Sequence, residues 1–227
     1  MKILLIAGHG GGDVGAVGCG YREADLTREV VKLVKSKLSN YATVEIADMS
    51  VNWYNNKAKL PLGSVDYVLE VHFNACVNDL KGNGVTTGTE IYVTTSEKGT
   101  TVEENIVKGI ARLGLKNRGL KRKNWSVINY CKSKGISSAL LELCFIDDAD
   151  DMKIYKTKKD SIADAITKGI VDGFGLKKAV DELKVACNLL ASKGIINSPD
   201  YWAKGKGYSD GNTVQLIKKF AAYVRGR

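Results

Sequence analysis

Short apolar runs separated by segments of helical periodicity are the feature that most restricts the folds open to this chain. The strand-length runs lie at 2–7, 43–47, 66–72, 90–93 and 139–146. Apolar residues recur three or four positions apart in the intervening segments at 23–38, 101–113 and 161–174. Strands that alternate with helices predict an α/β fold, in which helices flank a twisted, mostly parallel or mixed sheet.

The first run leads into a glycine-rich segment, G-H-G-G-G-D, that carries His9. Glu23 opens the next helical segment, and His72, the second of two histidines, ends the third run. Because ligands bind outside the carboxyl ends of parallel strands, we expect these three side chains to converge. Two imidazoles and one carboxylate suit Zn2+ and leave a position for water, so we predict a hydrolytic zinc site at these residues. The loop is too rich in glycine to order itself, and we expect the metal to order it.

Structural roles compete with each of these assignments. A histidine at the end of a strand is more often a hydrogen-bonded structural residue than a metal ligand, and a first-turn Glu23 suits the helix dipole. Asp13 fits a turn within its glycine loop. Glu70 shares a strand face with His72 and therefore competes for a metal role. Spacing alone does not rank these carboxylates.

Glu142 interrupts the most apolar run of the chain, S-A-L-L-E-L-C-F. Burial in such a run raises the pKa of a carboxyl group unless a cation lies close, and a buried carboxylate is costly without a purpose. We therefore expect Glu142 to be the general base of the site, the alternative being a structural pair with a lysine.

The cysteine pattern indicates reduced thiols rather than disulfides or a cysteine nucleophile. The number of cysteines is odd, no C-x-x-C pair occurs, and at least two of the five lie in apolar runs. The cysteines are Cys19, Cys76, Cys131, Cys144 and Cys187. Cys19 and Cys76 are near a histidine in sequence and are the alternative nucleophiles. Free cysteine usually packs as a small apolar residue, so we favour the zinc site.

The charge distribution predicts a polyanionic partner. The net charge is +9, and residues 177–227 carry ten Lys/Arg against four Asp/Glu, which leaves +3 for 1–176. Because aromatic residues do not interleave with the basic ones, we expect no nucleic acid partner. No run approaches the roughly 20 apolar residues of a membrane span, so we expect no membrane insertion. The first run is also too short for a signal peptide, which predicts synthesis in the cytoplasm and action after release.

The segment around 173–178 predicts a boundary between two domains, 1–176 and 177–227. The second is expected to be small, basic and helical, with helices at 179–193 and 213–224 and turns at 197–202 and 205–211. Within the first domain, polar composition predicts a loop with one helical turn at 48–64, a flexible loop at 81–88 and a strongly basic connection at 117–124.

Four motifs occur in order over residues 1–174: G-H-G-G-G-D-V-G-A-V-G followed by Glu23, then V-L-E-V-H-F-N-A, N-R-G-L and L-L-E-L-C-F-I-D-D. Together they resemble the zinc-dependent N-acetylmuramoyl-L-alanine amidases of the amidase-3 type. The resemblance implies that His9, Glu23 and His72 are the zinc ligands and Glu142 the catalytic glutamate. It further implies hydrolysis of the peptidoglycan amide between the lactyl group of N-acetylmuramic acid and L-alanine.

The resemblance also places residues around the reaction centre. Asn74 and Arg118 fall on motif positions and are expected to bind substrate or order loops. Asp13 and Glu70 are expected near the ligands, and Glu70 stands where many relatives carry a small residue such as serine. It therefore suggests a partner for a metal ligand or a local change of specificity.

The tail resembles short C-terminal segments of clostridial and phage lytic enzymes. This implies that 177–227 targets anionic wall polymers, the alternative being a helical appendage that packs on the catalytic domain or forms a homodimer. The expected absence of a signal peptide favours a phage endolysin or a lytic enzyme of the mother cell. Two other functions remain open, namely a zinc carboxypeptidase or endopeptidase of stem peptides and a wall-binding protein without catalysis.

Overall fold

A six-stranded mixed sheet organises residues 1–177 in this computed structural model, which describes residues 1–178, 182–204 and 211–226. The strand order is β4–β1–β5–β8–β6–β7. The strands are β1 (Lys2–Ala7), β4 (Thr43–Ile46), β5 (Tyr67–Asn74), β6 (Thr89–Val93), β7 (Asn117–Arg122) and β8 (Ser137–Phe145). Strands β4, β1, β5 and β8 are parallel, and β6 runs antiparallel to β8. The carboxyl ends of β4, β1, β5 and β8 therefore meet along one edge of the sheet.

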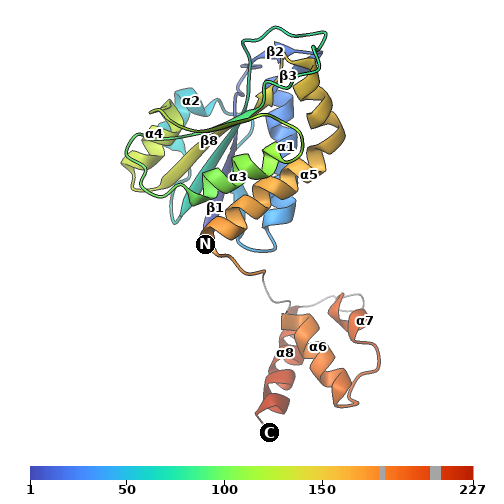
Figure 1. The fold of residues 1–227 in the computed structure, drawn as a ribbon. Helices are drawn as coiled ribbons and strands as arrows, with labels where there is room; N and C mark the ends of the chain where they lie inside the picture. The colour runs from blue at the N-terminus through green and yellow to red at the C-terminus, as the bar shows by residue number, and fades with distance from the viewer. Residues whose placement is uncertain (179–181, 205–210, 227) are drawn as a thin grey trace. The chain divides into compact units, whose positions relative to one another are not determined.

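Helices cover both faces of this sheet (Figure 1). One face carries α1 (Glu23–Leu38), α3 (Thr101–Ala111) and α5 (Ala149–Phe174). The other carries α2 (Trp53–Asn56), the short 3-10 helix η1 (Lys57–Lys59) and α4 (Ser126–Ser133). The predicted α/β class with a mixed sheet flanked by helices is confirmed.

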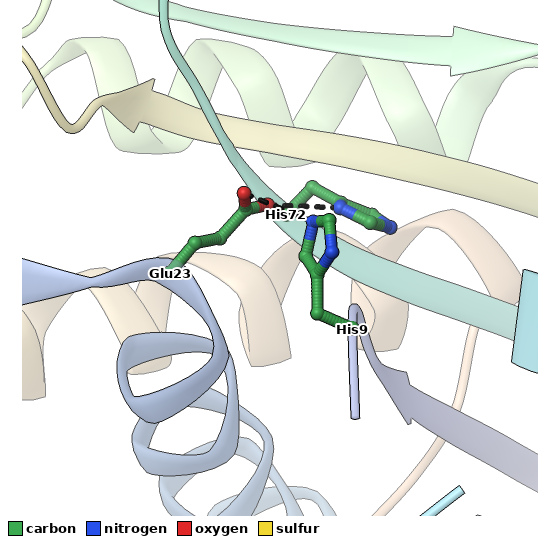
Figure 2. Close-up of side chains that lie close together, drawn as sticks. All are labelled: His9, Glu23 and His72. Atoms are coloured by element: carbon green, nitrogen blue, oxygen red, sulfur yellow. Dashed lines mark hydrogen bonds and ion pairs between the residues drawn. The ribbon is translucent and has the colours of Figure 1, made fainter. Parts of the chain in front are cut away.

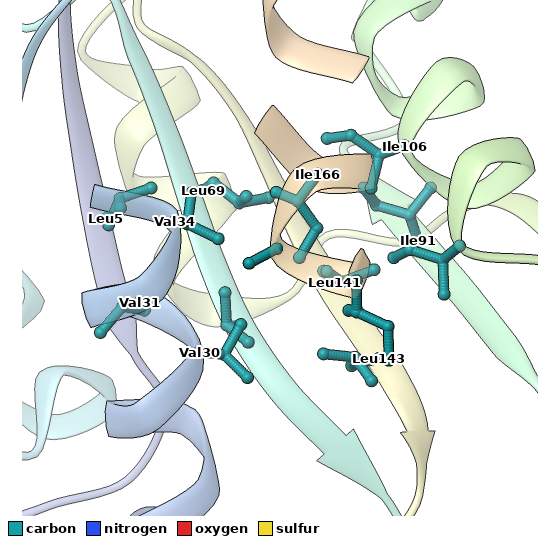
Figure 3. Packing of buried hydrophobic residues seen from close by; sticks show 14 of the residues in the cluster. Leu5, Val30, Val31, Val34, Leu69, Ile91, Ile106, Leu141, Leu143 and Ile166 are labelled. Atoms are coloured by element: carbon teal, nitrogen blue, oxygen red, sulfur yellow. The ribbon is translucent and has the colours of Figure 1, made fainter. Parts of the chain in front are cut away.

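The larger core lies between the sheet and helices α1, α3 and α5 (Figure 3). Leu5, Leu69 and Leu141 from three neighbouring strands are fully buried there, whereas Leu4 and Val68 point to the opposite face. A sheet buried on both faces needs apolar residues at successive positions, which explains the continuous apolar runs. Each fully buried side chain of this size stabilises the fold by roughly 1.5–3 kcal/mol.

Two segments of the first unit differ from the sequence-based expectation. Residues 117–122, predicted as a basic connection, form the edge strand β7, and basic side chains on an edge strand hide its pattern while protecting it from aggregation. Helix α5 begins at Ala149 rather than at 161. Asp148 caps it by accepting from the backbone N–H groups of Asp150 and Asp151, and its polar first half bends at Lys158.

The loop between β5 and β6, expected to be flexible at 81–88, is tied down by aspartate side chains. Asp147 accepts hydrogen bonds from the backbone N–H groups of Cys76, Val77 and Asn78 at 2.8–3.0 Å. Asp150 accepts from those of 83 and 84 at 2.9 and 2.7 Å. These bonds join the loop to the end of β8 and the start of α5.

The second unit, residues 178–227, is helical as expected, but the segment predicted as a turn at 197–202 mostly forms a short helix that begins at Pro199. Its helices are α6 (Glu182–Ser192), α7 (Pro199–Ala203) and α8 (Gly211–Arg225), and Ala186, Leu190 and Ala221 form a small core between α6 and α8. The predicted helix start at 179–181 and most of the turn at 205–211 lie outside the described residues. Within the described part of the chain, no helix is both long and apolar enough to span a membrane.

Candidate metal centre and active site

His9 follows the end of β1 in a left-handed backbone conformation, with φ of 64°. Its Nδ1 lies 2.8 Å from Oδ2 of Asp13. Asp13 is itself held by the N–H of Gly15 at 3.0 Å and by the side-chain amide of Asn52 at 3.1 Å. The glycine loop therefore fixes the orientation of the His9 ring and leaves Nε2 directed into the site.

Glu23 is the first residue of α1 and is almost fully buried. Its Oε2 accepts from the N–H of Ala16 and its Oε1 from that of Phe73, both at 2.9 Å. The same oxygens lie 2.9 Å from Nε2 of His9 and Nδ1 of His72. Burial raises the pKa of Glu23, but hydrogen bonds to His72 and His9 outweigh burial and hold the pKa well below its usual range.

His72 projects from β5, with its ring nearly perpendicular to that of His9 and the ring centroids 5.0 Å apart. Its Nε2 lies 3.2 Å from Oε1 of Glu70, so the ring is held between two carboxylates. Burial lowers the pKa of His72, but the hydrogen bonds to Glu23 and Glu70 raise it well above its usual value.

Two glycines leave the space that these rings occupy. A Cβ at Gly8 would lie 2.4 Å from Cε1 of His72, and a Cβ at Gly15 would lie 2.6 Å from Cδ2 of His9. Gly15 also has a φ of +68°, which other residues rarely adopt. The glycine-rich sequence thus serves close packing of the histidine rings against the backbone.

The three predicted ligands meet at one point (Figure 2). One potential ligand atom from each of His9, Glu23 and His72 lies within 4.8 Å of the others. Two imidazoles and a carboxylate form a donor set that suits Zn2+. In each histidine, one ring nitrogen faces Glu23 and the other lies beside a second carboxylate, that of Asp13 for His9 and that of Glu70 for His72. This arrangement orients histidine ligands in metal sites. The residues present therefore fit a zinc ion.

Glu142 lies beside this group because β8 pairs with β5 in a register that places it opposite His72. Its Oε2 is buried without a hydrogen-bond partner among the described residues. Burial is the main cause that raises the pKa of Glu142 to about 7. A carboxyl group with a pKa near neutrality can both accept and donate a proton.

A cavity of about 490 Å³ joins these residues. Its lining includes all the predicted site residues except Arg118, namely His9, Asp13, Glu23, Glu70, His72, Asn74 and Glu142. Neither Cys19 nor Cys76 lines it, and burial raises the pKa of the Cys19 thiol. The geometry therefore favours the histidine and carboxylate group over a cysteine nucleophile.

Two charged residues that sequence reasoning missed support the site. Arg28 of α1 donates to the carbonyl oxygens of His9 and Met49 beneath the glycine loop. Glu90 of β6 is buried and contacts Arg118, Lys121, Tyr92 and Asn74. The basic run at 118–122 could have indicated that a carboxylate such as Glu90 lies close to it. The pairing of β6 with β7, which brings them together, could not be predicted from the sequence.

Comparisons with known proteins agree with this arrangement. Residues 3–172 match the family Amidase_3, N-acetylmuramoyl-L-alanine amidase. The endolysin of Bacillus phage SPP1 is 31% identical over 191 residues, covering 78% of this chain and 67% of that protein. The N-acetylmuramoyl-L-alanine amidase LytC of Bacillus subtilis is 30% identical, covering 74% of this chain but 34% of LytC.

Solved structures extend the likeness to the fold. The N-acetylmuramoyl-L-alanine amidase of Clostridium difficile 630 has a TM-score of 0.64 at 22% identity, covering 77% of this chain and 96% of that chain. The sequence match covers most of residues 1–177. From the family match and these relatives, we conclude that the chain belongs to the Amidase_3 family and is an N-acetylmuramoyl-L-alanine amidase, a hydrolase of peptidoglycan.

Proposed function

We propose that residues 1–176 form a zinc amidase domain in which His9, Glu23 and His72 hold the ion. The observation that carries this proposal is the convergence of their ligand atoms within 4.8 Å, beside Glu142. Zn2+ in such a site supplies a Lewis acid that polarises a carbonyl group and activates water at neutral pH. The bond broken is the amide between the lactyl group of N-acetylmuramic acid and L-alanine.

Besides Glu23, two kinds of residue hold the ion, the histidines that bind it and the carboxylates that position the histidines. His9 would bind the ion through Nε2 and His72 through Nδ1, because these nitrogens face Glu23. Asp13 and Glu70 hold the opposite ring nitrogens, at 2.8 and 3.2 Å, and so keep both rings in place. These two carboxylates are positioning residues that act through the histidines.

Glu142 transfers the protons of the reaction. Its free Oε2 faces no protein donor among the described residues, so it is available to take a proton from the attacking water. With a pKa raised to about 7 by burial, it then returns a proton to the leaving amine of L-alanine. Asn74, which lines the cavity, is proposed to contact the substrate.

Mass spectrometry of digested muropeptides tests this function. Purified protein with one equivalent of zinc should create new free N-termini on L-alanine and leave bonds within the stem peptide intact. Cleavage only within the peptide would instead support a carboxypeptidase or endopeptidase. Wall binding without any new terminus would support a non-catalytic protein and contradict the proposal.

We further propose that residues 177–227 bring the amidase domain to anionic wall polymers during lysis of the host cell. The tail has a net charge of +6, and the similar SPP1 protein is an endolysin. A chain ending at Leu176 should cleave soluble muropeptides normally but sediment less with intact walls, more so at low salt. Equal sedimentation would dismiss targeting, and a dimer seen only for the full chain would favour self-association.

A further inference from the structure

Glu90 is a buried carboxylate that gathers two cations beside the cavity. It is 2% exposed, and its Oε2 lies 2.5 Å from both Nε of Arg118 and Nζ of Lys121. Its Oε1 accepts from the Tyr92 hydroxyl at 2.8 Å and from the Asn74 amide at 3.1 Å. One carboxylate with two cations leaves this group with a net positive charge.

This group borders the active site. Glu90 lies directly opposite Glu142 in the register of β6 and β8, and residues directly opposite on paired strands share a face of the sheet. Asn74 lines the cavity directly. Tyr92 packs edge-on against Trp125, another lining residue, with ring centroids 5.9 Å apart. Glu90 contacts Asn74 and Tyr92, so the two cations that it binds lie next to the part of the cavity lining formed by Asn74 and Trp125.

The cations still have binding capacity. Arg118 uses Nε for Glu90, and its two Nη groups make no hydrogen bond within the described part of the chain. The Arg118 side chain is 30% exposed and that of Lys121 is 38% exposed. The guanidinium also lies over the Phe145 ring, 4.9 Å from its centroid, which limits its rotation. A rigid, half-exposed guanidinium suits recognition of a carboxylate.

The rest of the cavity is hostile to a negative substrate group. Its lining carries four carboxyl groups close to the candidate metal, those of Asp13, Glu23, Glu70 and Glu142. These carboxylates outnumber the two positive charges that a bound Zn2+ ion would bring, so the favourable position for a substrate carboxylate is on the side of β6 and β7, where the two cations lie. The charge distribution thus orients an acidic substrate.

The spacing indicates which substrate group would reach these cations. Strand β7, which carries Arg118 and Lys121, is two strands from β8, which carries Glu142. This is about 10 Å at the usual separation of neighbouring strands. An extended peptide advances roughly 3.5 Å per residue. The matching carboxylate therefore belongs to a residue two or three positions beyond the scissile amide.

We propose that Arg118 and Lys121, anchored by Glu90, bind a free carboxylate of the second or third residue of the stem peptide. This subsite selects acidic stem peptides over those in which that carboxyl group is amidated. The inference deepens the proposed amidase function and rests on it.

Binding to the Glu142→Gln variant tests the subsite without turnover. The probes are N-acetylmuramoyl tripeptides with free carboxyl groups at the second and third residues, and matched peptides amidated at one or both. Calorimetric titration of the zinc-loaded variant should give a Kd about tenfold lower for one free carboxylate than for its amide, since a charged hydrogen bond contributes on that order when partly exposed. Equal affinities, or binding of neither peptide, would overturn the inference.

Substitution of the cations separates recognition from support of the wall. In the same background, Arg118→Gln and Lys121→Gln should weaken binding of the free acid about tenfold and leave that of the fully amidated peptide within twofold. Arg112→Gln removes the same charge from an exposed site on the far end of α3 and should change neither. Equal weakening of both peptides would show a structural role only and refute the subsite.

Turnover by the wild-type chain reports on the underlying function independently. Cleavage of the lactyl amide at similar rates in acid and amide substrates, with equal KM, rejects the subsite but keeps the amidase. Absence of cleavage at that amide in every substrate rejects the amidase proposal, while the titrations still decide whether the carboxylate is bound.

Discussion

Gly8→Ala should remove zinc from the protein without unfolding it. Gly8 continues the pairing of β1 with β5, since its N–H donates to the carbonyl of Val71 at 2.9 Å. Its φ lies outside the left-handed range, so alanine fits the backbone. The added methyl group would lie 2.4 Å from Cε1 of His72 and 2.6 Å from each of its ring nitrogens.

The overlap sets the size of the effect. Carbon atoms pack at about 3.5–4.0 Å, so the ring must move by about 1 Å. Zinc–nitrogen bonds tolerate roughly 0.2 Å, and a shift of this size takes His72 out of coordination. We expect zinc affinity to fall at least about 100-fold, close to 2.7 kcal/mol. Overpacking costs about 1–3 kcal/mol, less than the usual stability of a domain, so the fold should persist.

Competition with a chromophoric chelator measures the zinc affinity, and circular dichroism verifies the fold. Gly63→Ala is the matched control, because no heavy atom lies within 4 Å of its added Cβ. In a His72→Ala background, Gly8→Ala should cost nothing further if it acts through the ring. Undiminished zinc affinity in the single variant, or additive losses in the pair, would refute the reasoning.

Three other perturbations test the chemistry and the core. Glu142→Gln should lower amidase activity by 10²–10⁴-fold at unchanged zinc stoichiometry, measured by release of L-alanine N-termini and elemental analysis; retained activity would point to another base. Burial raises the pKa of Asp151 to about 6, so the native state binds the proton of this carboxyl group more tightly than the unfolded chain does. The free energy of unfolding should therefore fall by up to about 3 kcal/mol as the pH rises from about 4 to about 6. Denaturant titrations should therefore show wild type gaining stability relative to Asp151→Asn as pH falls through this window, and a constant difference would contradict the assignment. Leu141→Ala, in the fully buried centre of β8, should cost about 2–5 kcal/mol in the same assay, whereas exposed Leu80→Ala should cost less than about 0.5 kcal/mol.

The central strands were predictable from sequence because they are buried on both faces, which forces consecutive apolar residues in β1, β5 and β8. Edge strand β7 was not, because its stability comes largely from pairing with β6 and most of its side chains are polar. The first half of α5 was missed for a related reason. Its polar residues lack a continuous apolar stripe, and its start depends on a cap by Asp148.

The meeting of His9, Glu23 and His72 could be anticipated from the rule that parallel strands bring their carboxyl ends together. Their roles as zinc ligands remain a prediction. What sequence reasoning lacked was register. Only the pairing of β8 with β5 and β6 places Glu142 between His72 and Glu90, and a shift by one residue would turn it to the opposite face.

The glycine loop also has more internal order than its composition suggests. Gly10 and Asp13 exchange backbone hydrogen bonds at 3.1 Å, and Arg28 holds the loop from below. The loop conformation therefore does not depend on a metal alone. Glycine content indicates how freely the unfolded chain moves, but it does not show the contact with Arg28, a residue outside the loop.

The distribution of the site over β1, α1, β5 and β8 has a consequence for how the enzyme becomes active. These elements span most of the first unit, and the intervening loops must close before the strands pair. Tight zinc uptake during refolding should therefore coincide with the final assembly step rather than with early collapse. At a free zinc concentration of about 100 times Kd, binding would add about 2.7 kcal/mol to the stability of the sheet with the native strand order and none to other arrangements. Zinc binding would thus stabilise only chains whose strands have paired in the native order.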